Sequence, residues 1–235
     1  MRGISKTGVG EAQRHRVRSF VLRNSRLTKG QRGALESHWD QYGVSEETSA
    51  NIHTLFGNDA PTILEIGFGN GESLVETAAR HPENNYLGIE VHLPGIGRLL
   101  VELHNRNLNN VRIYCADAVE ILEDNIVDES LDGIHLFFPD PWSKRRHHKR
   151  RLVSDEFIEL AKKVLKSQGY FHAATDWKDY ARQIQRLFDG NKSFLSRSID
   201  DFYLDRTKDR PKTKFEKRGL SLGHQVWDLV YTKLE

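Results

Sequence analysis

The chain has 235 residues, 37% of them hydrophobic and 29% charged, which suits one soluble domain with a sizeable core. No apolar run approaches the ~18 residues of a membrane span, and the arginine-rich beginning lacks the apolar stretch of a secretory signal, so we expect a cytoplasmic protein. The single cysteine, Cys115, excludes an intrachain disulfide and lies in an apolar run, where a buried inert thiol is expected.

The formal net charge of +2 hides an asymmetry along the chain. Residues 1–35 contain nine Lys or Arg and one acid, a net charge of +8, so the remaining residues must sum to −6. A basic arm on a mildly acidic body favours an anionic polymer as partner. The alternative is a solvated tail without a role.

The chain is expected to divide into a basic N-terminal arm, residues 1–57, partly flexible and with a short helix around 45–55, and a single domain, residues 58–235. Most of that domain alternates short apolar strands with longer helical patterns, at spacings of roughly 20–35 residues, as parallel strands joined by crossover helices require. The expected strands are 62–66, 86–90, 111–115, 131–138 and 169–175. The expected helices are 72–80, 94–107, 118–125, 154–166 and 178–188.

A last strand is expected over residues 225–233, where apolar and polar residues alternate. Such alternation is typical of a strand with one wet face. We therefore predict that this segment joins the sheet late, at or near an edge.

A glycine loop follows the first expected strand, in the sequence TILEIGFGNGE of residues 62–72. Gly67, Gly69 and Gly71 permit positive φ angles and a close approach of a ligand, at the strand end where open α/β sheets bind ligands. The dinucleotide fingerprint requires a further glycine where Glu72 stands. Because Glu72 and Glu65 disfavour an anionic pyrophosphate, the loop favours a cationic cofactor such as S-adenosylmethionine.

Two further acids stand at the ends of the next strands: Glu90 ends the second expected strand, and Asp117 follows the third. Glu90 is placed to accept hydrogen bonds from a ribose diol, and Asp117 to meet an adenine edge, although an aspartate before a helix is also a good N-cap. The loop and these acids resemble the cofactor motifs of class I methyltransferases, over roughly residues 61–190. That resemblance implies a Rossmann-like α/β fold, with a seven-stranded, mostly parallel sheet, the last strand antiparallel, and helices on both faces.

The fourth expected strand ends in FPDPW, residues 138–142. Prolines on both sides of Asp140 make a rigid loop beside the expected methyl donor. Asp140 is expected to face the cleft, where a carboxylate can accept from N1–H and the 2-amino group of guanine. Trp142 is a candidate for stacking on a base, and the alternative is a rigid turn with a core tryptophan.

A basic run follows at residues 143–151, where six of nine residues are Lys or Arg. Runs of charge are usually solvated faces, but this one adjoins the expected reaction centre, which favours contact with phosphates. His147 and His148 are adjacent and have no cysteine or carboxylate arranged with them, so no metal is expected.

Three segments together carry a more specific resemblance: FPDPW-x-K-x-RHxKRR from residue 138, ATD at residues 174–176 and RPKTKFE at residues 210–216. They resemble the bacterial tRNA (guanine-N7-)-methyltransferase family, from about residue 35 onward. The resemblance implies transfer of a methyl group from S-adenosylmethionine to N7 of a guanine in the tRNA variable loop. We expect tRNA as the partner, no membrane and no obligatory protein partner, and a monomer or homodimer.

Carried over by position, the resemblance implies site residues. It implies cofactor contacts at Glu65, Glu90, Asp117 and Asp140, to which the loop adds Gly67, Gly69 and Gly71. It implies substrate contacts at Lys144, Asp176, Thr213, Lys214, Phe215 and Glu216. It implies RNA contacts at Arg146, His147, His148, Lys149, Arg150 and Arg151, within two RNA-binding segments, 143–151 and 206–218.

The chemistry at N7 needs no general base, because this nitrogen carries an in-plane lone pair and no proton at neutral pH. Catalysis then comes mainly from aligning nucleophile, methyl and sulfur, an effect of up to about 7–11 kcal/mol. Charge moves onto the purine and makes N1–H more acidic, so we expect Asp140 to orient and stabilise the base. Asp176 is the second candidate, and Lys144 is expected to hold O6 or a flanking phosphate.

Three other functions remain open on sequence alone. The first is methylation of an exocyclic amino group, because residues 140–142 faintly resemble the D/N-P-P-aromatic loop of enzymes with that activity, although here the prolines flank Asp140. A nicotinamide oxidoreductase is disfavoured by the missing fingerprint glycine and by Glu65 and Glu72. A non-catalytic RNA-binding module on a degenerate methyltransferase fold is disfavoured by the intact loop and the two strand-end acids.

Overall fold

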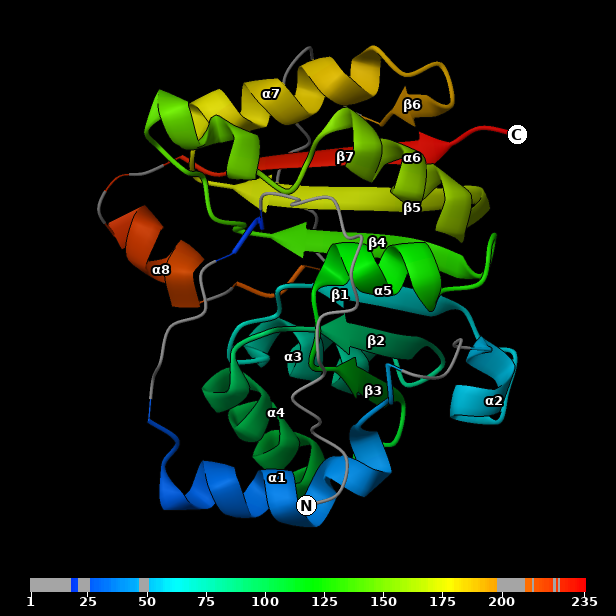
Figure 1. Ribbon diagram of the computed structural model, residues 1–235, viewed down its shortest axis with the longest axis vertical. Coiled ribbons are helices and arrows are strands. Elements are labelled where there is room, and N and C mark those ends of the chain that lie inside the picture. The colour runs from blue at the N-terminus through cyan, green and yellow to red at the C-terminus, as the bar shows by residue number, and fades with distance from the viewer. Residues whose placement is uncertain are drawn as a thin grey trace, which may run out of the picture.

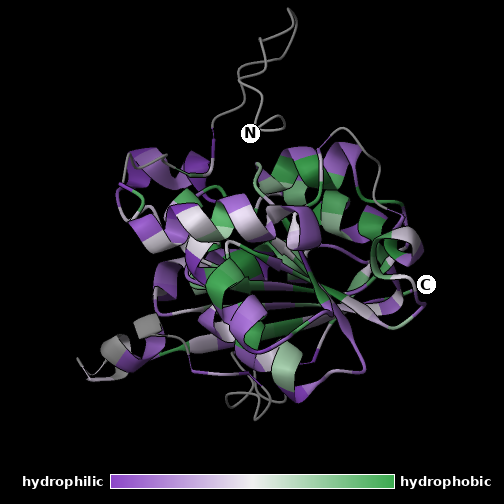
Figure 2. Ribbon diagram, turned by 90° about the horizontal axis from the view of Figure 1, so that it is seen from below, coloured by the Kyte–Doolittle hydropathy of each residue, from purple (hydrophilic) through white to green (hydrophobic). Residues whose placement is uncertain are grey.

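The computed structural model describes residues 18–20, 26–46, 51–197, 210–212, 214–221, 223 and 225–235. Within these residues one sheet runs in the order β3-β2-β1-β4-β5-β7-β6, between two layers of helices (Figures 1 and 2). Strands β1 to β5 pair in parallel, and β7 pairs antiparallel with both β5 and β6. The strands are β1 (Thr62–Ile66), β2 (Asn85–Ile89), β3 (Val111–Tyr114), β4 (Leu131–Phe137), β5 (Leu165–Thr175), β6 (Phe194–Ser196) and β7 (Trp227–Lys233).

The described helices are α1 (Lys29–Tyr42), α2 (Ile52–Phe56), α3 (Glu72–Arg80), α4 (Leu93–Asn105), α5 (Ala118–Asp124), α6 (Asp155–Val164), α7 (Lys178–Asp189) and α8 (Lys214–Ser221), with a 3-10 helix η1 (Arg145–Arg150). The five predicted helices correspond to α3, α4, α5, α6 and α7, and each begins and ends within two residues of its predicted bounds. Helix α6 begins after Ser154, whose hydroxyl accepts a hydrogen bond from the Phe157 amide at 3.3 Å. The side chain takes up one amide that the first helical turn leaves unpaired.

Apolar side chains on each face of the sheet form two separate cores. One core joins the sheet to α5, α6 and α7, through side chains such as Ile121, Phe157 and Phe188. The other joins it to α1, α3 and α4, through side chains such as Leu74 and Leu99. Figure 2 shows hydrophobic residues along the strands and in the helices that flank the sheet. Strands β1 to β3 are added in one direction along the sheet, and β4 and β5 are added in the other. The strand order therefore reverses between the neighbours β1 and β4, and in sheets of this kind the crevice at such a switch point binds ligands.

The last strand lies near an edge of the sheet, as predicted, but the wet face predicted for it is wrong. All seven residues of β7 are buried, and β7 lies between β5 and β6, so β6 rather than β7 forms the edge. The polar residues that suggested a wet face have partners inside the protein: Asp228 contacts His172 and Arg210, and the Lys233 ammonium donates to the Leu165 carbonyl at 2.8 Å. Alternation along β7 therefore reflects paired polar groups rather than exposure to water.

Helix α1 lies in the segment that the sequence assigned to the basic arm, yet it packs onto the domain. The Gln31 side chain donates to the Pro94 carbonyl of α4 at 3.1 Å, and Tyr42 is 1% exposed. The predicted short helix around 45–55 corresponds to α2, which begins at Ile52. In the part of the chain that the structure describes, no helix is long and apolar enough to cross a membrane.

Candidate active site

The glycine loop after β1 has the backbone that its sequence predicts. Gly67, Gly69 and Gly71 all have positive φ, at 70°, 58° and 78°. Gly71 also has no room for a side chain, because an added Cβ would lie 2.7 Å from the Leu99 side chain. The loop packs against α4 at Gly71, and the amides of its three glycines donate to the Ile89 carbonyl, the Glu90 carboxylate and the Phe68 carbonyl.

Glu90 follows β2 and is tied to this loop. Its Oε2 accepts from the Gly69 amide at 2.8 Å, and its Oε1 accepts from the amides of Val91 and His92 at 2.7 and 3.0 Å. A carboxylate offers about four acceptor positions, so these bonds fix its orientation and leave one position, on Oε2, for a ligand hydroxyl. Glu90 can accept hydrogen bonds from both hydroxyls of a ribose diol only if the hydrogen bond from the Gly69 amide to its Oε2 breaks.

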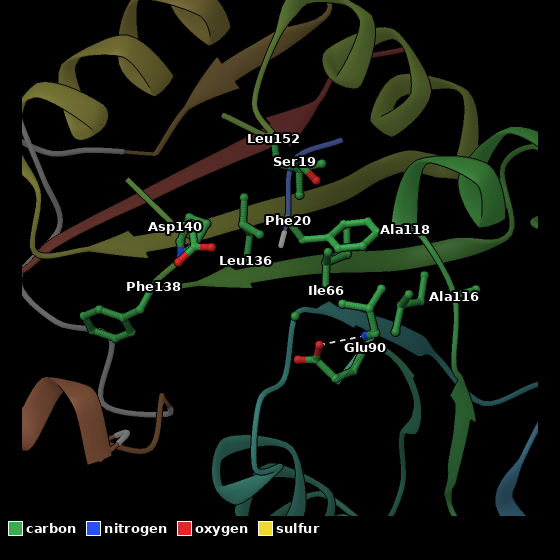
Figure 3. Close-up of a pocket in the computed structure, with 14 residues that line it drawn as sticks. Ser19, Phe20, Ile66, Glu90, Ala116, Ala118, Leu136, Phe138, Asp140 and Leu152 are labelled. Atoms are coloured by element: carbon green, nitrogen blue, oxygen red, sulfur yellow. Dashed lines mark hydrogen bonds between the residues drawn. The ribbon is translucent and has the colours of Figure 1, made fainter. Parts of the chain in front are cut away.

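A cavity of about 220 Å³ opens at the carboxyl ends of β1, β2 and β4 (Figure 3). It is lined by Ser19, Phe20, Ile66, Gly67, Ile89, Glu90, Val91, Ala116, Ala118, Leu136, Phe138, Pro139, Asp140 and Leu152. Among these lining residues are two carboxylates, Glu90 and Asp140, and no lysine, arginine or histidine. Most of the remaining lining is apolar, which suits a flat aromatic group beside a positively charged one.

Glu65 lies on β1 in register with Gly88 of β2 and His135 of β4. The side chain is 3% exposed, and this burial raises its pKa from 4.5 to about 8. Glu65 is absent from the cavity lining, although the next two residues, Ile66 and Gly67, belong to it. A cation in the cavity would stabilise the charged form of this carboxyl across the loop.

Asp117 takes the alternative role that the sequence left open. Its carboxylate accepts from the Val119 amide at 3.0 Å and so caps α5. Its neighbours on both sides, Ala116 and Ala118, line the cavity, so the half-buried Asp117 remains a predicted contact for a purine edge. The adjacent Cys115 is partly buried, and burial raises the pKa of its thiol to about 11, which keeps it neutral at pH 7.

Asp140 and Asp176 follow adjacent parallel strands, β4 and β5, at the carboxyl edge of the sheet. Asp140 is exposed at the cavity rim, and Asp176 is half-buried. The Phe138 amide donates to the Ala174 carbonyl at 2.7 Å, which ties the two strand ends together. Phe138 and Trp142 have positive φ angles of 53° and 45°, so the loop around Asp140 is tightly turned on both sides.

Trp142 uses its ring inside the protein. Its Nε1 donates to the Ser19 carbonyl at 3.0 Å, and the Arg150 guanidinium lies 5.0 Å from the ring centre. We therefore do not propose base stacking on Trp142. The same hydrogen bond brings the N-terminal segment to the cavity, where the Phe20 ring points toward Ala118 (Figure 3). The sequence placed neither Ser19 nor Phe20 at the site, because the contact joins residues far apart in the chain.

The basic run forms η1, and its residues do not share one environment. Arg145, Arg146 and Lys149 are exposed, and Lys144 just before them is exposed as well. Arg151 is buried: it donates to the Pro141 carbonyl at 2.8 Å, to Gln183 at 2.7 Å and to Asp179 at 2.7 Å. The predicted RNA contact by Arg151 is thus replaced by a structural role, because its donors already hold the Asp140 loop against α7. His148 contacts this same cluster, with its Nε2 3.1 Å from an Arg151 nitrogen.

The C-terminal substrate segment is described only in part. Thr213 lies outside the described residues, and of Lys214 and Phe215 only the backbone, within α8, is described. Glu216 is 1% exposed and accepts two hydrogen bonds from Arg210, at 2.8 and 3.0 Å. A direct contact between Glu216 and a substrate is therefore not available in this arrangement.

The fold agrees with that of known methyltransferases. The 16S rRNA methyltransferase KamB superposes with a TM-score of 0.59 at 14% sequence identity, covering 80% of this chain and 94% of that one. At this identity the likeness shows the fold alone. Sheet order, glycine loop and cavity together show that the chain has the class I methyltransferase fold.

Sequence comparisons place the chain more narrowly. A family model described as "Putative methyltransferase" matches residues 59–229. The chain is 52% identical over 221 residues to the tRNA (guanine-N(7)-)-methyltransferase of Yersinia pseudotuberculosis serotype I (strain IP32953), covering 94% of this chain and 92% of the relative. It is 51% identical over 227 residues to the protein of the same name from Serratia proteamaculans (strain 568), covering 96% and 95%. The chain belongs to the tRNA (guanine-N(7)-)-methyltransferase family.

Proposed function

We propose that the chain transfers the methyl group of S-adenosylmethionine to N7 of a guanine in the tRNA variable loop, and that it does so in the cytoplasm. One observation supports the choice of cofactor above others: among the residues that the structure describes, those that line the cavity include two carboxylates and no basic side chain. Such a lining repels a pyrophosphate and suits a ligand with a sulfonium and an ammonium group. The names of the relatives support the substrate and the position.

The residues around the cavity fit this cofactor group by group. Ile89, Ala116 and Ala118 offer apolar surface for the adenine ring, and the free acceptor position on Glu90 suits a ribose hydroxyl. When bound, S-adenosylmethionine supplies an electrophilic methyl group on a sulfonium. Glu90, fixed by three backbone amides, holds its charge at a set position without reorganising. The positive φ angles at Phe138 and Trp142 turn the backbone of the loop that carries the second carboxylate, Asp140, at the rim of the cavity.

Asp140 is the residue that we assign to the guanine. Methyl transfer from bound S-adenosylmethionine to the N7 lone pair would release S-adenosylhomocysteine and leave positive charge on the purine. An Asp140 carboxylate that accepts from N1–H and the 2-amino group stabilises this charge as it forms. Asp176, at the end of the adjacent strand, is the second candidate for that contact.

The exposed part of η1 is assigned to the tRNA backbone. For the double variant Arg146→Ala with Lys149→Ala we expect weaker tRNA binding and a shallower dependence of log affinity on log salt, by about 1.5 units of slope, because two phosphate contacts are lost. The measurement is the dissociation constant for tRNA at several salt concentrations. The control is Lys192→Ala, an exposed lysine between α7 and β6. An unchanged slope in the double variant would remove η1 from the RNA interface.

The function itself is tested by incubating the protein with isotope-labelled S-adenosylmethionine and total tRNA, and identifying the labelled nucleoside. We expect label in 7-methylguanosine. Label on an exocyclic amino group would shift the proposal to the rival methyltransferase class. Cofactor binding without transfer to any RNA would favour a non-catalytic RNA-binding module. Binding of NADH in place of S-adenosylhomocysteine would favour the oxidoreductase.

A further inference from the structure

A buried ion-pair network lies between α8 and the sheet, outside the cavity. The Arg210 guanidinium donates to Asp228 at 2.7 and 2.9 Å and to Glu216 at 2.8 and 3.0 Å. All three side chains are 1–2% exposed. Asp228 also contacts the His172 Nε2 at 2.7 Å, so the network reaches from β7 into β5. A planar guanidinium can bind two carboxylates in this forked manner, and a lysine ammonium cannot.

The same guanidinium covers the strand end that leads to Asp140. Its central carbon lies 5.5 Å from the centre of the Phe137 ring and 5.6 Å from that of the Phe138 ring. Phe138 lines the cavity and is two residues from Asp140. Arg210 therefore touches α8 through Glu216, the sheet through Asp228, and the rim of the cavity through Phe138.

The position of α8 makes this three-way contact relevant to the reaction. Figure 1 shows α8 beside the carboxyl ends of the central strands, next to the region that holds the cavity. The first turn of α8 carries residues that the family resemblance assigns to the substrate, yet Glu216 in that turn is committed to Arg210. Glu216 thus contributes by fixing the helix rather than by meeting the base.

We propose that Arg210 is a positioning residue that locks α8, and the substrate groups it carries, to the loop of Phe138 and Asp140 at the methyl-donor cavity. This inference rests on the proposed function, since it concerns how the guanine is held relative to the methyl group. Alignment of nucleophile and methyl carbon dominates such a transfer, and a displacement of about 1 Å can cost about 100-fold in rate.

Arg210→Lys tests the proposal, because it keeps the charge but loses the fork. We expect kcat for an in vitro transcribed tRNA to fall about 100-fold, while the dissociation constant for S-adenosylhomocysteine changes less than about threefold. Rates are expressed per site that binds S-adenosylhomocysteine, so that unfolded protein does not count. A second variant, Glu216→Gln, leaves the Arg210–Asp228 pair intact and is expected to lower kcat as well. If Arg210→Lys does not fold, the kcat of Glu216→Gln tests the proposal in its place.

The matched control is Arg112→Lys, an arginine at β3 whose bonds go to the Asn109 and Val111 carbonyls. It is expected to leave kcat unchanged. A purely structural role for Arg210 predicts a lower melting temperature with normal kcat per site, and that result overturns the proposal. So does a loss of cofactor affinity as large as the loss of kcat. A wild-type chain that binds S-adenosylhomocysteine but forms no 7-methylguanosine overturns the proposed function as well.

Discussion

Asp140→Ala is expected to reduce kcat for methyl transfer to tRNA by about 100- to 1,000-fold, the usual effect of removing one group that stabilises developing charge. Asp140 stands at the rim of the cavity, in a loop that Arg151 ties to α7. Asp140→Asn is expected to lose nearly as much, because an amide presents its NH₂ to donors on guanine and accepts only through its one oxygen. Single-turnover rates with saturating tRNA and cofactor measure the effect.

Cofactor affinity separates the two roles predicted for Asp140. A loss confined to binding of S-adenosylmethionine would make Asp140 a cofactor residue alone, whereas the guanine role requires a loss of kcat at saturation. The control is Asp128→Ala, an exposed acid in the loop before β4, near Lys163. Full turnover in both Asp140 variants would remove this residue from the chemistry.

The parallel part of the fold was predictable because each of its signals is local. The strand over residues 62–66 and the helix over 72–80 have the predicted bounds, since an apolar strand, three glycines and an amphipathic helix follow one another directly. The seven-stranded sheet with an antiparallel last strand is confirmed. The number of strands and the antiparallel last strand came from the family resemblance, and the strand order was not predicted, because strand neighbours depend on contacts between distant segments.

The environment of charged residues was harder to predict. Arg150 and Arg151 are adjacent in one basic run, yet Arg151 is buried among Pro141, Gln183 and Asp179. Its partners are separated from it by up to 32 residues along the chain, so no pattern within residues 143–151 marks the difference. The wet face expected for β7 was wrong for the same reason, since Asp228 finds its partners on β5 and before α8.

The contribution of the N-terminal segment to the cavity also escaped prediction. Its charge indicates an anionic partner, but the residues that reach the cavity are Ser19 and Phe20, which carry no charge. Ser19 is held through its backbone carbonyl, which any residue type would provide. A contact made through a backbone carbonyl cannot be predicted from the residue types of a single sequence.

The second large effect is expected from Glu65→Gln, and it arises from burial. The pKa of Glu65 is raised from 4.5 to about 8 because burial disfavours the carboxylate. The folded state therefore binds a proton that the unfolded state releases above pH 4.5. The free energy of unfolding falls as the pH rises from 4.5 to about 8, by about 3 kcal/mol at pH 7, and is unaffected below pH 4.5. The glutamine variant removes this penalty and should be more stable than the wild type at pH 7, by up to that amount.

The same proton should appear in cofactor binding. A cationic ligand beyond Ile66 and Gly67 favours the ionised form of Glu65, so binding at pH 7 should release close to one proton in the wild type and none in Glu65→Gln. Affinity for S-adenosylmethionine should rise with pH up to about 8, by as much as tenfold per unit, and stay level in the variant. Calorimetry in buffers of different ionisation enthalpy counts the protons, with the exposed Glu83→Gln as control. If wild type and Glu65→Gln release the same number of protons, the bound cation does not change the ionisation of Glu65. The electrostatic argument for the cofactor would then depend on Glu90 and Asp140 alone.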